Sequence, residues 1–132
     1  MTGLDTNVLA RYFVKDDAQQ GERASALLLN ECTPESPGFV NYIVLCELVW
    51  VLGQCYDIPK ERIVGVLAEI LQAPQIRVQS PRTVWLALED YSQGAADFAD
   101  CLVARVNLDY HCEATLTFDR DAADSPGFRL LR

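Results

Sequence analysis

The stretch that decides the fold is Thr2-Gly3-Leu4-Asp5-Thr6-Asn7-Val8-Leu9, at the beginning of the sequence. A very short apolar run ends at Asp5, and apolar residues at helical spacing follow from Val8 to Phe13. This pattern predicts a short strand, a turn and a helix. Asp5 would then lie at the carboxyl end of a strand, which is where open α/β sheets build their binding sites.

The rest of the sequence repeats this alternation of strands and helices. Apolar periodicity and turn residues predict helices over 19–31, 42–56, 60–71 and 82–92, and one that starts at Asp97. They also predict strands at 39–40, 76–78 and 114–118, and an edge strand at 128–131. Strands that alternate with helices form mostly parallel sheets covered by helices on both faces. The prediction is therefore one α/β domain over residues 1–132.

Composition limits the functional classes. Eleven basic and nineteen acidic residues among 132 give a net charge of −8, which argues against a broad basic surface that wraps nucleic acid. A nuclease is still compatible with this charge, because carboxylates that hold metal ions count as negative residues. No apolar run approaches the roughly 20 residues of a membrane span. We expect a cytoplasmic protein without a secretory leader or a membrane association.

The cysteines and the histidine exclude some chemistries. The five cysteines are an odd number and form no C-x-x-C pair. Because Cys46, Cys55 and Cys101 fall in apolar helical stretches, we interpret the cysteines as reduced thiols in the core of a cytosolic protein. The single histidine, His111, excludes a mechanism that needs two.

Acidic residues occur at four places that suggest chemistry. Asp5 and Asp119 both follow strand-like runs, so a parallel sheet would bring them to the same edge. Asp97 and Asp100 are three residues apart at a helix start, on neighbouring points of one face. Glu47 lies in a helix that is apolar nearly all round and is expected to be buried, where a carboxylate must be paired or bind a cation. Divalent Mg²⁺ and Mn²⁺ prefer such hard oxygen ligands.

Each of these places also has an ordinary explanation. Glu47 could lie on the one wet edge of its helix, and Asp97 could be a simple helix N-cap. The segment Asp119-Arg120-Asp121 could be a polar turn, and Thr6 or Asn7 could cap the first helix. The combination favours a site, because all four places fall where they could converge on one rim of the sheet.

Four segments resemble the acidic motifs of PIN-domain ribonucleases, in the same order and at similar spacing over essentially the whole chain. They are Leu4-Asp5-Thr6-Asn7-Val8, Cys46-Glu47-Leu48, the segment from Ala96 to Ala104, and the segment from Thr115 to Asp121. The chain length is most similar to that of VapC-type toxins from bacterial type II toxin–antitoxin systems. Each motif is weak alone, and the four in order are much more specific.

The resemblance implies a three-layer α/β/α sandwich on a mostly parallel sheet of about five short strands. It also implies cleavage of RNA that depends on Mg²⁺ or Mn²⁺. Carried over residue by residue, the catalytic and metal-binding acids would be Asp5, Glu47, Asp100 and Asp119, with Asp5 and Asp100 as the nearest ligands.

The resemblance further implies secondary residues and protein partners. Asp97 would be an additional acid at the rim, Asp121 an outer-shell acid, and Asn7 and Thr117 polar supports for Asp5 and Asp119. Members of this family usually form homodimers, and a small cognate antitoxin typically covers the site. A site rich in carboxylates would attract an arginine or lysine of such a partner.

The residues themselves agree with this chemistry. A metal-free attack by the 2′-hydroxyl that uses two histidines is disfavoured, so attack by metal-activated water remains, leaving a 5′-phosphate and a 3′-hydroxyl. Candidate RNA contacts near the motifs are Arg11, Lys15, Arg82 and Arg120. Several apolar residues exceed what a small core needs and could line a dimer or antitoxin groove: Val49, Trp50, Leu52, Val64 and Trp85.

Four other functions share some of these features. A haloacid-dehalogenase-type phosphatase needs a D-x-D pair, and its second position here is Asn7. A receiver-type signalling domain needs two adjacent early acids and a phosphoacceptor, and neither is evident. A housekeeping RNA-processing nuclease shares every catalytic feature and differs only in lacking an antitoxin neighbour and growth arrest. The sequence is also compatible with a catalytically silent domain that docks a partner through its acids.

Overall fold

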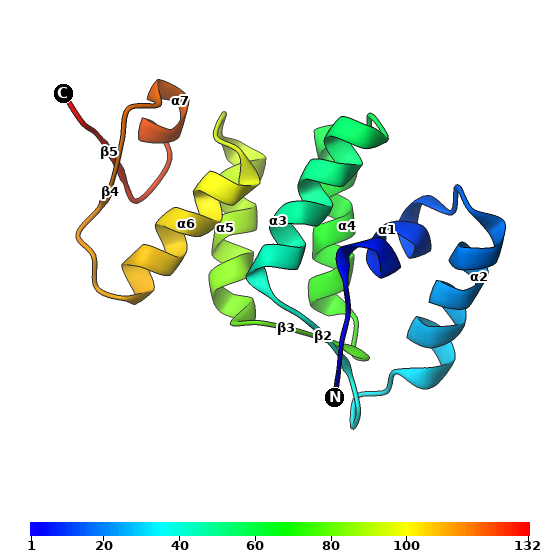
Figure 1. The fold of residues 1–132 in the computed structure, drawn as a ribbon. Helices are drawn as coiled ribbons and strands as arrows, with labels where there is room; N and C mark the ends of the chain where they lie inside the picture. Colours follow the sequence, from blue (N-terminus) through cyan, green and yellow to red (C-terminus); the bar gives the residue numbers. More distant parts are fainter. The chain divides into compact units, whose positions relative to one another are not determined.

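The computed structural model describes residues 1–132 and divides into two compact units, Met1–Gln79 and Ser80–Arg132 (Figure 1). The first unit contains β1 (Thr2–Gly3), α1 (Thr6–Val14), α2 (Ala18–Ala26), β2 (Gly38–Val40), α3 (Tyr42–Trp50), α4 (Lys60–Gln72) and β3 (Ile76–Val78). The second contains α5 (Pro81–Gln93), α6 (Phe98–Asp109), β4 (Thr115–Thr117), α7 (Arg120–Ala123) and β5 (Phe128–Leu130). Helices α2 and α3 each continue into a π-helical turn, Leu27–Glu31 and Val51–Cys55.

The α/β class, the parallel pairing and the five short strands are confirmed. The strands are hydrogen-bonded as a three-stranded sheet in the first unit, in the order β1-β2-β3, and as the pair β4-β5 in the second. All pairings are parallel. The short α7 was not predicted, since its residues read as a polar turn in the sequence. That the two units form a single domain stays a prediction.

The first sheet brings the carboxyl ends of its strands to one edge. Gly38 pairs with Thr2 on one side and with Ile76 on the other. The backbone N–H of Leu4 donates to the Phe39 carbonyl at 2.8 Å, which extends this pairing past the end of β1. The chain therefore leaves the sheet at Asp5 with its direction fixed.

Gly38 is required at this position by a close approach. A Cβ atom there would come within 2.6 Å of Cδ1 of Leu4, which is far inside van der Waals contact. Leu4 is itself buried, so its side chain has no room to retreat. A side chain at position 38 would push Leu4 and the start of α1 away from the sheet.

The core of the first unit comes from every one of its helices and from its central strand. Helix α1 packs on α2 and α3, and α4 packs on β3. Burying each aliphatic side chain stabilises the fold by about 1.5–3 kcal/mol relative to leaving it exposed. The fully buried side chains are Leu9, Leu28, Val40, Leu45, Leu48, Leu52, Leu67 and Ile70.

Helix α3 corrects one prediction. It was expected to be buried all round, but Ile43 is 71% and Trp50 63% exposed, and Glu47 between them is exposed as well. These residues follow the i, i+4, i+7 spacing of one helix face. Only the opposite face, with Val44 and Leu48, is buried. When a helix carries apolar residues on both faces, its sequence does not show which face is exposed to solvent.

One smaller expectation was also wrong, and two further apolar side chains lie outside the core. Trp85 is 38% exposed, and Leu29 is exposed too. Cys55 is exposed, so not every helical cysteine is in the core, although all five cysteines are free and Cys101 is buried. In each case the side chain lies at the border of an apolar stripe, where periodicity does not fix burial.

The second unit is organised around the packing of α5 against α6 (Figure 1). The rings of Tyr91 and Phe98 meet edge to face, with centroids 5.8 Å apart. Arg105 on α6 donates from Nε and Nη2 to the two carboxylate oxygens of Asp90 on α5, at 2.6 and 2.9 Å.

No helix of the structure has the length and apolar character needed to cross a membrane.

The Arg105–Asp90 ion pair gives the first testable prediction. Asp90 is 7% exposed, so Arg105→Met leaves a carboxylate buried without its partner and should lower the free energy of unfolding by about 3 kcal/mol. Urea titration followed by circular dichroism measures this change. Arg23→Met, which breaks the exposed pair with Glu31, is the matched control and should change stability little. Equal losses in the two variants would contradict the structural role of the Arg105–Asp90 pair.

Candidate active site

Asp5 lies two residues after the end of β1 and is the N-cap of α1. One of its carboxylate oxygens accepts a hydrogen bond from the backbone N–H of Thr6 at 2.8 Å. The cap is therefore Asp5 itself, and not Thr6 or Asn7, which were the alternatives considered from the sequence. The Asp5 side chain is exposed, so its second oxygen is accessible to a ligand.

Thr6 links the first candidate acid to the second. Its side chain is buried, with 7% of the residue exposed, and its hydroxyl donates to Oε1 of Glu47 at 2.9 Å. The sequence suggested that Glu47 is held in place by burial. Glu47 is exposed instead, and the Thr6 hydroxyl fixes the orientation of its carboxylate. Sequence reasoning considered Thr6 only as a cap. The sequence signal for this supporting role was that Thr6 follows Asp5 in the first acidic segment.

Two amide side chains fix the start of α3, the helix that carries Glu47. Oδ1 of Asn41 accepts from the backbone N–H of Val44 at 2.9 Å, which is ordinary N-capping. Oε1 of Gln79, just after β3, accepts from the backbone N–H of Tyr42 at 3.0 Å. Gln79 was missed, because nothing in the sequence signals a contact between residues this far apart.

In the second unit, Asp97 and Asp100 lie at the start of α6. Asp97 occupies the N-cap position with extended backbone, but its side chain makes no capping hydrogen bond. Its carboxylate is therefore not used to cap the helix, which removes the ordinary explanation for this residue. Asp100 lies in the first turn of the helix and is half-buried.

Asp119 follows β4 and is held by its neighbours. Its Oδ1 accepts from the backbone N–H groups of Asp121 and Ala122 at 2.9 and 3.3 Å, which caps the short helix α7. Its own N–H donates to the Thr117 hydroxyl at 3.0 Å, the kind of supporting contact expected of Thr117. Asp121 is exposed. Asn7, the other expected support, makes no hydrogen bond to Asp5.

The acids of the second unit lie close enough to affect one another. Burial raises the pKa of the Asp100 carboxyl, and the negative charges of Asp97 and Asp119 raise this pKa further. None of the three acids belongs to an ion pair. The ion pairs of the structure are Arg11–Asp16, Arg23–Glu31 and Arg105–Asp90. An uncompensated group of carboxylates is an arrangement that a bound cation would stabilise.

The donor set fits a hard divalent cation in its chemistry. Carboxylate oxygens are the ligands that Mg²⁺ and Mn²⁺ prefer, and Mg²⁺ usually keeps several waters beside one or two carboxylates. Neither unit gathers three or more acidic, histidine or cysteine side chains into a group that could hold an ion alone. Solvent or substrate oxygens would therefore complete the coordination.

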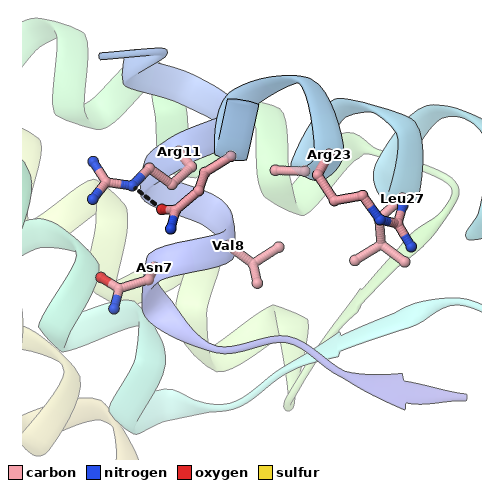
Figure 2. A pocket seen from close by; sticks show the side chains of 7 residues that line it. Asn7, Val8, Arg11, Arg23 and Leu27 are labelled. Atoms are coloured by element: carbon pink, nitrogen blue, oxygen red, sulfur yellow. Dashed lines mark hydrogen bonds between the residues drawn. The ribbon is translucent and has the colours of Figure 1, made fainter. Parts of the chain in front are cut away.

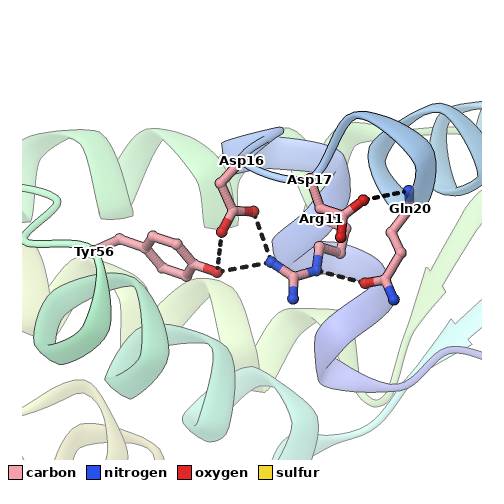
Figure 3. Close-up of polar contacts among 5 residues, drawn as sticks. All are labelled: Arg11, Asp16, Asp17, Gln20 and Tyr56. Carbon is pink, nitrogen blue, oxygen red and sulfur yellow. Dashed lines mark hydrogen bonds and ion pairs between the residues drawn. The ribbon is translucent and has the colours of Figure 1, made fainter.

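The four candidate RNA contacts differ in their surroundings. Arg11 is engaged, because its Nη1 lies 2.7 Å from Asp16 and 3.1 Å from the Tyr56 hydroxyl (Figure 3). Lys15 is exposed, with Nζ 5.8 Å from the centre of the Tyr12 ring. The remaining two candidates, Arg82 and Arg120, are exposed and form no ion pair. Contact with RNA stays a prediction for all four.

The raised pKa of Asp100 makes a prediction about stability. A carboxyl whose pKa is higher in the folded state than in the unfolded state destabilises the fold once pH exceeds the unfolded value. Asp100→Asn should therefore raise the unfolding temperature at pH 7 in EDTA, and this gain should vanish as the pH falls below the ordinary aspartate range. Asp57→Asn is the control at an exposed loop aspartate. A gain of the same size at low pH would contradict the electrostatic explanation.

Comparison with known proteins identifies the family. The family model of the PIN domain matches residues 4–127, which span both units and all four acidic segments. No curated protein matches the chain. PIN domains are generally nucleases, and they typically use Mg²⁺ or Mn²⁺. The parallel strands, and the acids two residues after the ends of β1 and β4, agree with this match. On this evidence the chain belongs to the PIN domain family.

Proposed function

We propose that this PIN domain is a metal-dependent endoribonuclease in which Asp5, Glu47, Asp100 and Asp119 are the catalytic carboxylates. The observation that carries the proposal is the group of acids without cationic partners in the second unit, where burial and the negative charges of Asp97 and Asp119 raise the pKa of Asp100. Bound Mg²⁺ or Mn²⁺ would supply Lewis acidity toward the phosphate and lower the pKa of a bound water.

The chain's own residues have distinct roles in this proposal. Asp5 and Asp100 are the nearest metal ligands, and Glu47 and Asp119 complete the set of metal-binding acids. Thr6 positions Glu47 through its hydroxyl, at 2.9 Å, and Thr117 positions the backbone of Asp119, at 3.0 Å. Asp97 and Asp121 are additional acids at the edge of the site.

The finer part of the proposal is a biological role as a toxin of the VapC type. We propose a cytoplasmic homodimer that a small cognate antitoxin inhibits. The net charge of −8 suits a basic segment of such a partner, and the exposed Ile43 and Trp50 of α3 offer apolar surface for a protein contact. A housekeeping RNA-processing nuclease is the alternative. Growth arrest on expression, relieved by a neighbouring gene product, separates the two.

Cleavage of RNA by the purified protein tests the reaction. With Mg²⁺ or Mn²⁺ present, we expect cuts that leave 5′-phosphates, and EDTA should abolish them. Asp5→Asn and Asp100→Asn should each slow cleavage at least about a hundredfold, because each removes several kcal/mol of transition-state stabilisation. Asn caps helices as well as Asp does, so Asp5→Asn keeps the start of α1.

The matched control for cleavage is Asp57→Asn. This residue is exposed and has φ of 52°, a backbone conformation that Asn also tolerates, so the variant should keep wild-type activity. Metal-independent cleavage, or full activity in both Asp5→Asn and Asp100→Asn, would refute the assignment. Loss of activity in Asp57→Asn as well would point to general damage of the fold.

The Thr6 hydroxyl gives a separate prediction. Thr6→Val keeps the shape of the buried side chain but removes the donor to Glu47, so divalent-ion affinity should fall about 10-fold or more. Thr6→Ser keeps the hydroxyl and should behave like the wild type. Isothermal titration with Mn²⁺ measures both variants without reference to cleavage. If Thr6→Val binds as the wild type does, Glu47 does not depend on Thr6.

A further inference from the structure

A pocket of about 290 Å³ lies between α1 and α2 in the first unit (Figure 2). Helix α1 contributes Asn7, Val8 and Arg11. Figure 2 shows Arg23 of α2 and Leu27, the first residue of the π-helical turn that continues α2, across from them. The pocket thus begins two residues after Asp5, on the helix that Asp5 caps. Gln20 and Ala24 of α2 complete its lining.

The lining combines an apolar floor with flat polar groups. Val8, Ala24 and Leu27 are apolar, while two guanidinium groups and the amides of Asn7 and Gln20 supply hydrogen-bonding edges. No carboxylate lines the pocket, although the chain as a whole carries a net charge of −8. Guanidinium groups and hydrogen bonds to base edges are among the contacts that proteins use to hold unstacked bases of single-stranded RNA.

Both arginines already have acidic partners outside the pocket lining. Nη1 of Arg11 lies 2.7 Å from Asp16, and Nη1 of Arg23 lies 2.6 Å from Glu31. The pocket therefore offers guanidinium planes and N–H groups with little net charge. This favours a neutral, flat ligand with a polar edge over a phosphate group or an acidic peptide.

The Arg11 side chain is also held in place before any ligand arrives. Its Nε donates to Oε1 of Gln20 at 2.7 Å, and the Tyr56 hydroxyl and Asp16 contact its other side (Figure 3). Asp17 accepts from the backbone N–H of Gln20 at 2.9 Å and so fixes the start of α2. A fixed guanidinium loses little conformational entropy on binding, which suits a hydrogen-bond donor to the edge of a flat ligand.

We propose that this α1–α2 pocket binds an unpaired nucleobase of the RNA strand and acts as a subsite next to the catalytic acid Asp5. The assignment rests on the proposed ribonuclease function and extends it, since it names a position at which the enzyme would select its substrate. Val8 and Leu27 contact the face of the base. Arg11, Arg23 and the two amides contact its edge.

Methyl NMR of Val- and Leu-labelled protein in EDTA tests the subsite without any cleavage. The 5′-mononucleotides of the four RNA bases are titrated, with ribose 5-phosphate as the probe that lacks a base. We expect the Val8 and Leu27 methyl signals to shift with at least one nucleotide and not with ribose 5-phosphate. Equal shifts with ribose 5-phosphate, or no shift with any nucleotide, would overturn the proposal.

Two variants and one control locate the binding. Ala24→Leu fills the pocket, and Arg23→Gln removes an exposed guanidinium, so each should weaken nucleotide binding about tenfold, as expected for one lost contact with the base. Arg62→Gln, at an exposed residue of α4 outside the pocket, should bind as the wild type does. Unchanged binding in both Ala24→Leu and Arg23→Gln would refute the site. Arg23→Gln keeps the test valid if Ala24→Leu is unstable.

The results separate the subsite from the nuclease. Nucleotide binding at these methyls without RNA cleavage would support the subsite and refute the reaction. RNA cleavage by the wild type and Arg23→Gln at equal kcat/KM, with the methyl signals unmoved, would refute the subsite alone. A peptide of acidic and apolar residues is the last probe. If it moves the Val8 and Leu27 signals and nucleotides do not, the pocket binds a protein partner and the proposal fails.

Discussion

The pairing of β1 with β2 is the constraint on which the candidate site of the first unit depends. β1 is only two residues long, too short to be stable alone, and its alignment rests on backbone hydrogen bonds to the neighbouring chain and on the buried Leu4. Gly38 makes this possible, because any side chain there would occupy the space of Leu4. Once Leu4 is fixed, Asp5 caps α1, and Thr6 faces Glu47.

The acids of the second unit are arranged at a cost in stability. Asp97 is not used as a cap, Asp100 is half-buried and affected by the charges of two other carboxylates, and none of the three belongs to an ion pair. A sequence selected for stability alone would place a neutral residue or a lysine here. Groups that are kept in an unfavourable charge state are typical of sites where a ligand supplies the missing charge.

The sequence predicted the positions of the helices and strands better than the exposure and the long-range contacts of their side chains. The strands and the starts of α3 and α6 follow from local patterns, because the backbone and its nearest neighbours determine them. The exposure of Glu47 and Trp85 depends on which helix face meets the core, and helices with apolar residues on both faces do not reveal this. The contacts of Thr6 with Glu47 and of Tyr42 with Gln79 join distant segments, so no local pattern predicts them.

The charge of the chain determines how it could hold RNA. A protein that neutralises many phosphates gains affinity from the release of counterions, and this requires a concentration of free lysine and arginine. Here the net charge is −8, and three arginines are already paired with acids. Phosphate contacts alone would therefore give weak binding. More of the affinity must come from stacking and hydrogen bonds to bases, which depend little on net charge. The proposed base subsite in the α1–α2 pocket would supply such contacts in the same unit as Asp5.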